Sequence, residues 1–299
     1  LDRDGRLLGL PYFYRDSRTN GMIEKAFEKV PEKEIYGATG IASIFLNSLY
    51  QLLSEAEGGN PGLEAAEDLL FIPDLLGYWL TGNKTQERSI ASTSQLYNPN
   101  TRDWDYKLIE KLGLPKHLFK TISDPGEELG ELREKVARRT GLVGTKVITV
   151  AGHDTASAVA AVPSQSPTPA YLSSGTWSLL GLELQHPVIN EDSLKDGFTN
   201  EIGVGNTIRF LKNICGLWLI QQTRRYWKAG GEDIAYSKMA GFAAEAEPFR
   251  SLIDPDSPLF VEEGRMPEKI QEFCKDTDQP VPESKGQIIR CIYESLALR

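Results

Sequence analysis

The sequence predicts an α/β protein built from two domains. Its 299 residues are enough for two domains of ordinary size. Segments with helical spacing alternate with short apolar runs rich in β-branched residues. A run rich in Pro and Ser, PSQSPTPA at residues 163–170, interrupts this pattern as a linker does. We therefore expect one domain over residues 1–164 and a second over residues 165–299.

The first domain is predicted to contain one opening strand, many helices and one further strand. The letters RDG indicate a turn, and RLLGLPYFY at residues 6–14 reads as the strand after it. The polar segment 84–105 reads as loop, and TKVITVA at residues 145–151 reads as a buried strand ending at Val150. Helical spacing marks the segments 15–30, 42–56, 62–82 (broken at Pro73), 106–114 and 130–142.

The second domain is predicted to open with two strands, residues 170–174 and 176–184, joined at Gly175. A further strand covers residues 206–212, a helix covers residues 214–227, and the remainder reads as helix and loop.

Both ends of the chain predict that it is an internal piece of a longer protein. The first residue is not Met, and only Leu1 stands where a strand should precede the first turn. The last helical pattern runs to Arg299 without a stop signal.

Composition favours a globular protein of the cytoplasm. The formal net charge is −9, a poor balance for binding nucleic acid or a membrane surface. No apolar run approaches the roughly 20 residues needed to span a bilayer, and no signal peptide is visible.

Three cysteines, at positions 215, 274 and 291, are too few for a zinc site or a disulfide framework, and reduced thiols are expected. Cys274 and Cys291 flank the loop 275–284, so an antiparallel turn would bring them close.

The stretch TVAGHDTASAVAAV, residues 149–162, holds the main candidate for a reacting group. Gly152 lets the chain turn after the strand, and Asp154 or Thr155 then caps a helix of small residues. One interpretation makes Asp154 a helix cap only. The other uses the same geometry, because a carboxylate between a strand end and a helix start lies where open α/β sheets bind ligands. An ionised aspartate there can accept a proton from a substrate hydroxyl.

A metal site or a hydrolase triad at His153-Asp154 is disfavoured. The other two histidines, His117 and His186, lie in unrelated loops, and no further ligands occur at useful spacing. No Gly-x-Ser-x-Gly elbow is present, and adjacent His and Asp residues are poorly placed to act as a base and its orienting group.

Two other segments carry weaker signals. The turn at residues 173–176 offers backbone and hydroxyl donors that could hold a phosphate, although a plain hairpin is the favoured interpretation of this segment alone. Asn213 is predicted at a strand end and helix start, where its simplest role is a cap. Gln221 follows eight residues later, about 12 Å along a helix, and could touch a neighbouring ligand or lie on a solvated face.

Several phrases then occur together in a characteristic order. They are YRDSRTNGM, AGHDTASAVAA, AYLSSGTWSLLG, LKNICGLWLIQ and PVPESKGQIIRCIYESLAL. This ordered set resembles the rhamnulokinases, a branch of the FGGY carbohydrate kinases, and the resemblance extends over essentially all of the chain. YRDSRT and LKNICGLWL carry the narrower likeness to that branch.

The resemblance implies an actin/hexokinase-like (ribonuclease H-like) ATPase fold of two domains with a cleft between them, truncated here at both ends. The implied reaction converts L-rhamnulose and ATP to L-rhamnulose 1-phosphate and ADP. Asp154 matches the position of the catalytic base.

The same resemblance implies positions for the two substrates. The sugar is expected largely on the first domain, in contact with His153, Asp154 and Thr155, and with Asn213 from the second. ATP is expected largely on the second domain, in contact with Thr176 and Gln221.

Much of the nucleotide site is expected outside the chain. The first phosphate hairpin, with the aspartate that organises Mg²⁺, would precede Leu1, so no metal ligand is assigned here. The adenosine loop would follow Arg299. We therefore expect the isolated 299 residues to be inactive. The alternatives are a kinase for another ketose (fuculose, ribulose or xylulose) and a sugar-binding remnant without activity.

Overall fold

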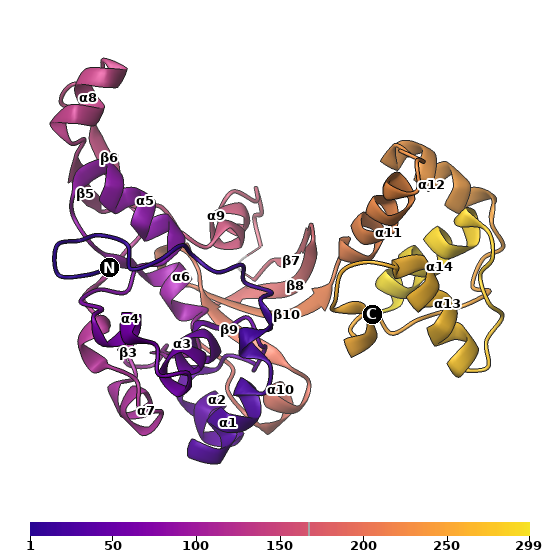
Figure 1. Ribbon diagram of the computed structural model, residues 1–299, viewed down its shortest axis with the longest axis horizontal. Helices are drawn as coiled ribbons and strands as arrows, with labels where there is room; N and C mark the ends of the chain where they lie inside the picture. The colour runs from indigo at the N-terminus through magenta and orange to yellow at the C-terminus, as the bar shows by residue number, and fades with distance from the viewer. Residues whose placement is uncertain (167) are drawn as a thin grey trace. The chain divides into compact units, whose positions relative to one another are not determined.

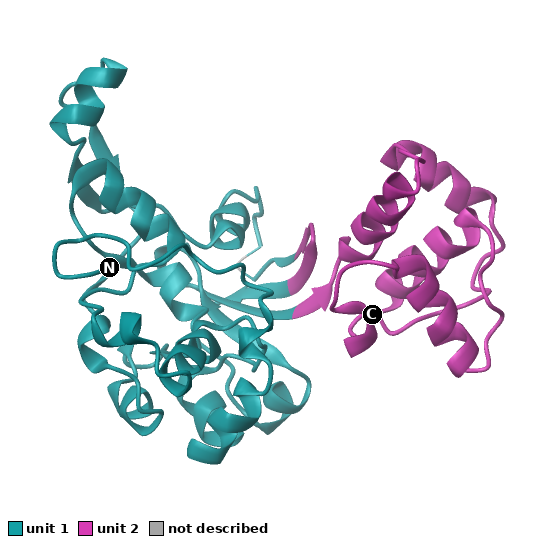
Figure 2. Ribbon diagram, in the orientation of Figure 1, with its two compact units in different colours: residues 1–171, 181–212 teal, residues 172–180, 213–299 magenta. Residues whose placement is uncertain are grey.

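The computed structural model describes residues 1–166 and 168–299 (Figure 1). The chain divides into two compact units (Figure 2). Unit 1 contains Leu1–Tyr171 and Gly181–Lys212, and unit 2 contains Leu172–Leu180 and Asn213–Arg299. This grouping by contacts has no single boundary along the sequence, and the division at residue 164 stays a prediction. Pro167, in the expected linker, lies outside the described residues.

Unit 1 is built mainly from short helices and two-residue strands. Its helical elements are η1 (Ser17–Thr19), α1 (Met22–Lys29), α2 (Glu32–Thr39), α3 (Ser48–Glu57), α4 (Pro61–Glu64), α5 (Ile72–Thr81), α6 (Arg88–Ser92), α7 (Tyr106–Lys111), η2 (Lys116–Leu118), α8 (Glu134–Thr140), α9 (Asp154–Ala160), α10 (Glu191–Lys195) and η3 (Val204–Asn206). The predicted helical segments are thus present, and Pro73 stands in the first turn of α5, where its missing N–H costs nothing.

The core of unit 1 forms where apolar helix faces meet. Helices α1 and α3 lie side by side (Figure 1). Tyr50 and Leu53 of α3 are fully buried, and Ala26 of α1 packs in the same cluster as Ile109 of α7. Helical spacing predicted these helices because their buried residues recur on one face.

Within residues 1–166 and 168–299, the strands form four small sheets. The largest has the strand order β7-β8-β10-β9, from β7 (Ala170–Ser174), β8 (Trp177–Leu184), β10 (Ile208–Cys215) and β9 (Phe198–Ile202). Strands β9 and β10 are antiparallel, with Arg209 directly opposite Glu201. The two-stranded sheets are β1 (Gln86–Glu87) with β4 (Ile122–Ser123), β2 (Tyr97–Asn98) with β3 (Asp103–Trp104), and β5 (Glu128–Glu131) with β6 (Lys146–Ile148).

The expected opening strand is absent. The turn itself forms, since the N–H of Asp2 donates to the Arg6 carbonyl and the N–H of Gly5 donates to the Asp2 carbonyl, both at 2.9 Å. Residues 6–14, all of them described, form no strand, and Leu10 is 87% exposed. The turn signal and the apolar run after it predicted a strand, but this segment pairs with no described strand.

The strand expected before the GHD turn is shorter and more exposed than predicted. Strand β6 covers only Lys146–Ile148 and pairs antiparallel with β5. Ile148 and Val150 are 47% and 65% exposed, so the prediction of a buried strand ending at Val150 is wrong. A run of β-branched residues predicts a strand, but its burial depends on which other elements pack against it.

Unit 2 packs helices α11 (Trp218–Ala229), α12 (Tyr236–Glu245), α13 (Met266–Asp276) and α14 (Lys285–Leu298) around their own core, with η4 (Pro258–Phe260) beside α13. Helices α12 and α14 approach so closely that a Cβ at Gly286 would collide with the Phe242 carbonyl oxygen. Ser284 and Gln287 form a reciprocal capping box at the start of α14.

Cys274 of α13 and Cys291 of α14 are buried thiols in hydrogen-bond contact. The neighbouring thiol and burial together raise the pKa of Cys291. The expectation that the chain turns back and brings these residues together is confirmed.

Within residues 1–166 and 168–299, no helix is both long and apolar enough to cross a bilayer.

Candidate active site

Asp154 is the first residue of α9 and points into solvent. Its side chain is 97% exposed. The N-cap is His153, which makes no side-chain capping bond, so the prediction that Asp154 or Thr155 caps the helix is wrong by one position. Asp154 Oδ1 instead accepts a hydrogen bond from the Thr155 N–H at 2.7 Å. The other carboxylate oxygen is open to a ligand.

The backbone before Asp154 is clamped by two buried residues of unit 1. Glu87 is 2% exposed and caps α6, accepting hydrogen bonds from the N–H groups of Ser89 and Ile90. Its Oε2 also accepts from the Gly152 N–H at 2.8 Å and from the Ser89 hydroxyl at 2.6 Å. The Ser89 hydroxyl in turn accepts from the His153 N–H at 3.2 Å. The turn that carries Asp154 is therefore fixed by a chain of hydrogen bonds to α6.

The side chain of His153 is held separately. Its Nδ1 lies 2.9 Å from Arg209 Nη2 and 3.1 Å from Glu201 Oε2. Burial alone would raise the pKa of the Glu201 carboxyl, but His153, when its ring is protonated, and Arg209 outweigh it and hold that pKa at about 2. His153 Nε2 lies 3.7 Å from Asp154 Oδ1, too far for a hydrogen bond. The two neighbours are thus independent groups side by side and do not form a base and its orienting partner.

A second buried carboxyl, that of Asp74, lies next to Glu87. Asp74 of α5 is 4% exposed, and its Oδ1 accepts a hydrogen bond from the Glu87 N–H at 3.2 Å. Its Oδ2 has no hydrogen-bond partner among the described residues. Burial, assisted by the Glu87 charge, raises the pKa of Asp74 to about 7.

In unit 2, the turn between β7 and β8 rests on the start of α11. The carbonyls of Gly175 and Thr176 accept from the N–H groups of Leu217 and Trp218, at 2.8 and 3.2 Å. The Thr176 hydroxyl donates to Gln221 Oε1 at 3.3 Å, so the structure brings these two predicted residues together. The Gly175 N–H donates to the Trp177 carbonyl, which leaves one fewer backbone donor for a phosphate.

Asn213 lies inside β10 and not at the start of a helix. Helix α11 begins five residues later, at Trp218, so neither the cap role of Asn213 nor its predicted 12 Å helical separation from Gln221 holds. The strand continues to Cys215 because its residues still pair in the sheet, a long-range effect that local spacing does not reveal.

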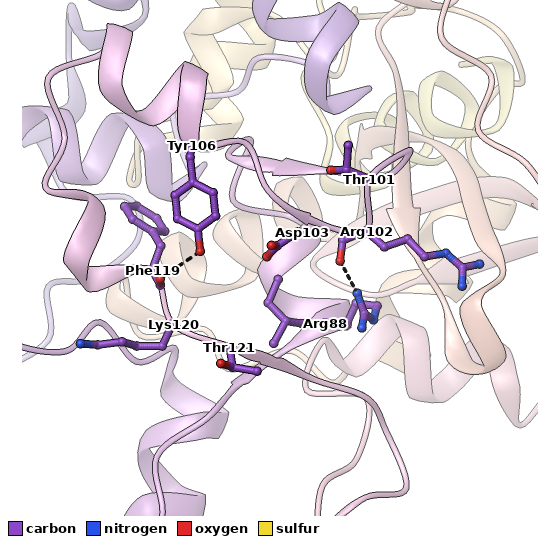
Figure 3. A pocket seen from close by; sticks show the side chains of 9 residues that line it. Arg88, Thr101, Arg102, Asp103, Tyr106, Phe119, Lys120 and Thr121 are labelled. Atoms are coloured by element: carbon purple, nitrogen blue, oxygen red, sulfur yellow. Dashed lines mark hydrogen bonds between the residues drawn. The ribbon is translucent and has the colours of Figure 1, made fainter.

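A cavity of about 540 Å³ elsewhere in unit 1 contains none of the predicted site residues. In Figure 3 the side chains of Arg102 and Lys120 extend away from its centre, while Arg88 donates to the Arg102 carbonyl and Tyr106 to the Phe119 carbonyl. Four of its lining side chains, those of Arg88, Tyr106, Arg102 and Lys120, are therefore already engaged or turned outward.

The residues that support the site were not among the predicted site residues. Segment 84–105 was predicted as a polar loop, yet Glu87 and Ser89 are among its buried residues. Glu201 and Arg209 were overlooked because β9 was not predicted, although their spacing around a Gly-containing turn could have indicated a cross-strand pair.

In the part of the chain that the structure describes, no three His, Cys, Asp or Glu side chains are grouped so that they could hold a metal ion.

One family of known proteins matches this chain over nearly all of its length. The N-terminal domain of the FGGY family of carbohydrate kinases matches residues 1–161, and its C-terminal domain matches residues 170–299. The chain belongs to the FGGY family of carbohydrate kinases, and its α/β fold is the two-domain sugar-kinase fold of the actin/hexokinase-like group.

Within that family, the chain is similar to enzymes named rhamnulokinase. The protein of Bacteroides thetaiotaomicron is 48% identical over 299 residues, covering 100% of this chain and 61% of the relative. That of Enterococcus faecalis is 41% identical over 298 residues, covering 100% of this chain and 59% of the relative. The chain thus spans about three fifths of the length of these relatives.

Solved structures share the fold at low identity. Ligand-bound xylulose kinase from Lactobacillus acidophilus matches with a TM-score of 0.73 and 18% identity, over 99% of this chain and 59% of that one. Plasmodium falciparum glycerol kinase with ADP matches with a TM-score of 0.68 and 15% identity, over 98% of this chain and 58% of that one.

Proposed function

We propose that this chain is part of an ATP-dependent kinase that phosphorylates L-rhamnulose at O1, giving L-rhamnulose 1-phosphate and ADP. The observation that carries the proposal is the exposed Asp154 carboxylate, held on a clamped turn at the start of α9. Membership of a carbohydrate-kinase family supports the reaction, and the similarity to rhamnulokinases supports the substrate.

The chemistry requires a group that accepts one proton. The sugar 1-hydroxyl oxygen forms a bond to the γ-phosphorus of ATP, the bond from that phosphorus to the bridging oxygen breaks, and ADP leaves. Asp154 accepts the proton that the hydroxyl loses. Asp154 lies in the first turn of α9, where the helix dipole interacts favourably with a negative charge.

The other predicted residues take binding roles in this proposal. His153 and Thr155, on either side of the base, contact the sugar, and Asn213 contacts it from unit 2. Thr176 and Gln221, which hydrogen-bond to one another, contact ATP. The clamp from Glu87 and Ser89 keeps the base at a fixed position relative to the sugar, which matters because phosphoryl transfer depends on positioning.

Magnesium is expected to accompany ATP and to neutralise charge on its phosphates. The described residues do not fit a complete Mg²⁺ site, since no group of three suitable ligands is found among them. We therefore assign no magnesium ligand to the described residues, and none of the steps above to the metal.

The test is a panel of ketoses offered to the protein encoded by the whole gene. L-rhamnulose, L-fuculose, D-ribulose and D-xylulose are compared by ketose-dependent ADP release. We expect kcat/KM to be at least about tenfold higher for L-rhamnulose, the scale on which a site separates close analogues. Phosphorus–proton couplings in the NMR spectrum of the product are expected to place the phosphate on C1.

Other results would point to the competing functions. A higher kcat/KM for another ketose would replace L-rhamnulose as the substrate. Sugar binding without ADP release, from a folded protein, would indicate a binding protein and contradict the kinase. Residues 1–299 assayed alone are predicted not to turn over, because part of the nucleotide site is expected elsewhere.

A further inference from the structure

We infer that Arg209 and Glu201 are positioning residues for His153. Arg209 donates a hydrogen bond to Nδ1, which places the imidazole proton on Nε2, and Glu201 balances the charge of the guanidinium. His153 then offers Nε2–H as a hydrogen-bond donor beside the Asp154 carboxylate. Naming a sugar oxygen as the acceptor of that hydrogen bond rests on the proposed function.

The distances distinguish between the two possible partners of Nδ1. Arg209 Nη2 lies 2.9 Å from Nδ1 and forms a hydrogen bond with it. A guanidinium can only donate, so Nδ1 must accept with its lone pair and cannot carry the proton. Glu201 Oε2 lies 3.1 Å from Nδ1 but makes no well-directed hydrogen bond within residues 1–166 and 168–299. Its closer neighbour is Arg209 Nη2, at 2.9 Å.

The burial of this pair argues for a role beyond stability. The Arg209 side chain is 0% exposed and that of Glu201 is 7% exposed. Removing two charges from water is costly, and well-packed apolar residues often stabilise a core as well as a buried ion pair does. The two residues are direct cross-strand partners in β9 and β10, so the hairpin fixes the guanidinium firmly where His153 needs a donor.

The resulting arrangement suits a ligand with neighbouring hydroxyl groups. His153 Nε2 and Asp154 Oδ1 are 3.7 Å apart, one presenting a donor and the other an acceptor. One hydroxyl oxygen of a polyol can accept from Nε2–H while the adjacent hydroxyl donates to Asp154. A doubly protonated imidazole would instead compete with the substrate for the Asp154 charge.

The test reads the tautomer directly. Long-range proton–nitrogen correlations of the imidazole rings report the tautomer of each histidine separately. At about pH 8, in the protein encoded by the whole gene, His153 is expected to show the Nε2–H pattern. His153→Gln identifies its signals. An Nδ1–H pattern, with Glu201 as acceptor, or a doubly protonated ring would overturn the inference.

A double variant tests the consequence for binding. Glu201→Gln with Arg209→Met removes both charges together, which avoids leaving one buried and unpaired. We expect the ketose KM to rise about tenfold or more, with a smaller change in kcat, because a charge-assisted hydrogen bond no longer orients His153. The matched control is Asp68→Asn with Lys84→Met, another partly buried ion pair of unit 1, which is expected to leave the ketose KM unchanged.

The tautomer measurement and the comparison of ketose KM values test different parts of the inference. The tautomer is measured without turnover, so it holds or fails whatever the ketose panel shows. A kinase whose ketose KM responds equally to the Glu201/Arg209 and Asp68/Lys84 variants would contradict the positioning role while leaving the proposed reaction intact.

Discussion

The turn that presents Asp154 depends on carboxyl groups that never reach solvent. Glu87 binds the Gly152 N–H directly, and Asp74 lies behind it, accepting from the Glu87 N–H. Two buried carboxyls so close together cannot both remain charged cheaply, because each lacks water and each repels the other. Burial, with the Glu87 charge adding to it, raises the pKa of Asp74 to about 7.

This arrangement predicts an unusual pH dependence of stability. The pKa of Asp74 rises from 3.8 to about 7 on folding, so between those values the folded state binds a proton that the unfolded state releases. The free energy of unfolding therefore falls as the pH rises through this window, by about 1.4 kcal/mol per pH unit at most. Asp74→Asn keeps the acceptor for the Glu87 N–H and removes the titration.

Urea unfolding at pH 5 and pH 8 measures the effect. We expect the wild type to lose roughly 2–3 kcal/mol more than Asp74→Asn between the two values. Glu201, with its pKa held at about 2, stays ionised throughout and does not contribute to the difference. Parallel pH profiles for wild type and variant would show that Asp74 titrates normally.

Single elements bring residues together that the sequence keeps far apart. The β7–β8 turn and the start of α11 are about 40 residues apart, yet Gly216 lies directly against the turn. A Cβ at this position would lie 2.6 Å from the Trp177 carbonyl carbon and 2.7 Å from the Ser178 nitrogen. Only glycine permits this approach, which places Thr176 against Gln221.

Gly216→Ala is therefore expected to displace the turn from α11. We predict a loss of about 1–3 kcal/mol in the free energy of unfolding, as for other overpacked sites, and a higher KM for ATP with little change in the ketose KM. Gly241→Ala in α12 is the control, since its Cβ would meet nothing within 4 Å and alanine favours a helix by roughly 0.5–1 kcal/mol. A Gly216→Ala protein with wild-type stability and ATP KM would refute the account of this contact.

For the molecule as a whole, local patterns predicted most helices and few of the contacts between them. Helices such as α1 and α14 were foreseen because each buries one face in the core of its own unit. Strand β9 and the buried polar segment around Glu87 were not, because their environment comes from residues distant in sequence. The polar side chains of that segment are buried because backbone N–H groups satisfy them, and composition does not record this.

At the candidate site too, local patterns predicted some features, and others depend on residues distant in the sequence. The GHD motif identified Asp154, and the resemblance to a family supplied its role. Glu87, which holds the turn before Asp154, and Arg209, which holds the His153 ring, come from more than 50 residues away on either side. Such partners follow from tertiary structure and leave no local signal in the sequence.

The most direct test of the account compares ketose-dependent ADP release by the wild-type protein and by Asp154→Asn. Because Asp154 is 97% exposed, the substitution should leave the fold intact and remove only the proton acceptor. We predict that kcat falls by about 10²–10⁴, the usual contribution of a general base, while the ketose KM stays close to the wild-type value. Asp192→Asn, which changes an exposed aspartate in the first turn of α10, should have no effect. Turnover by Asp154→Asn near the wild-type rate would contradict the assignment of Asp154 as the base.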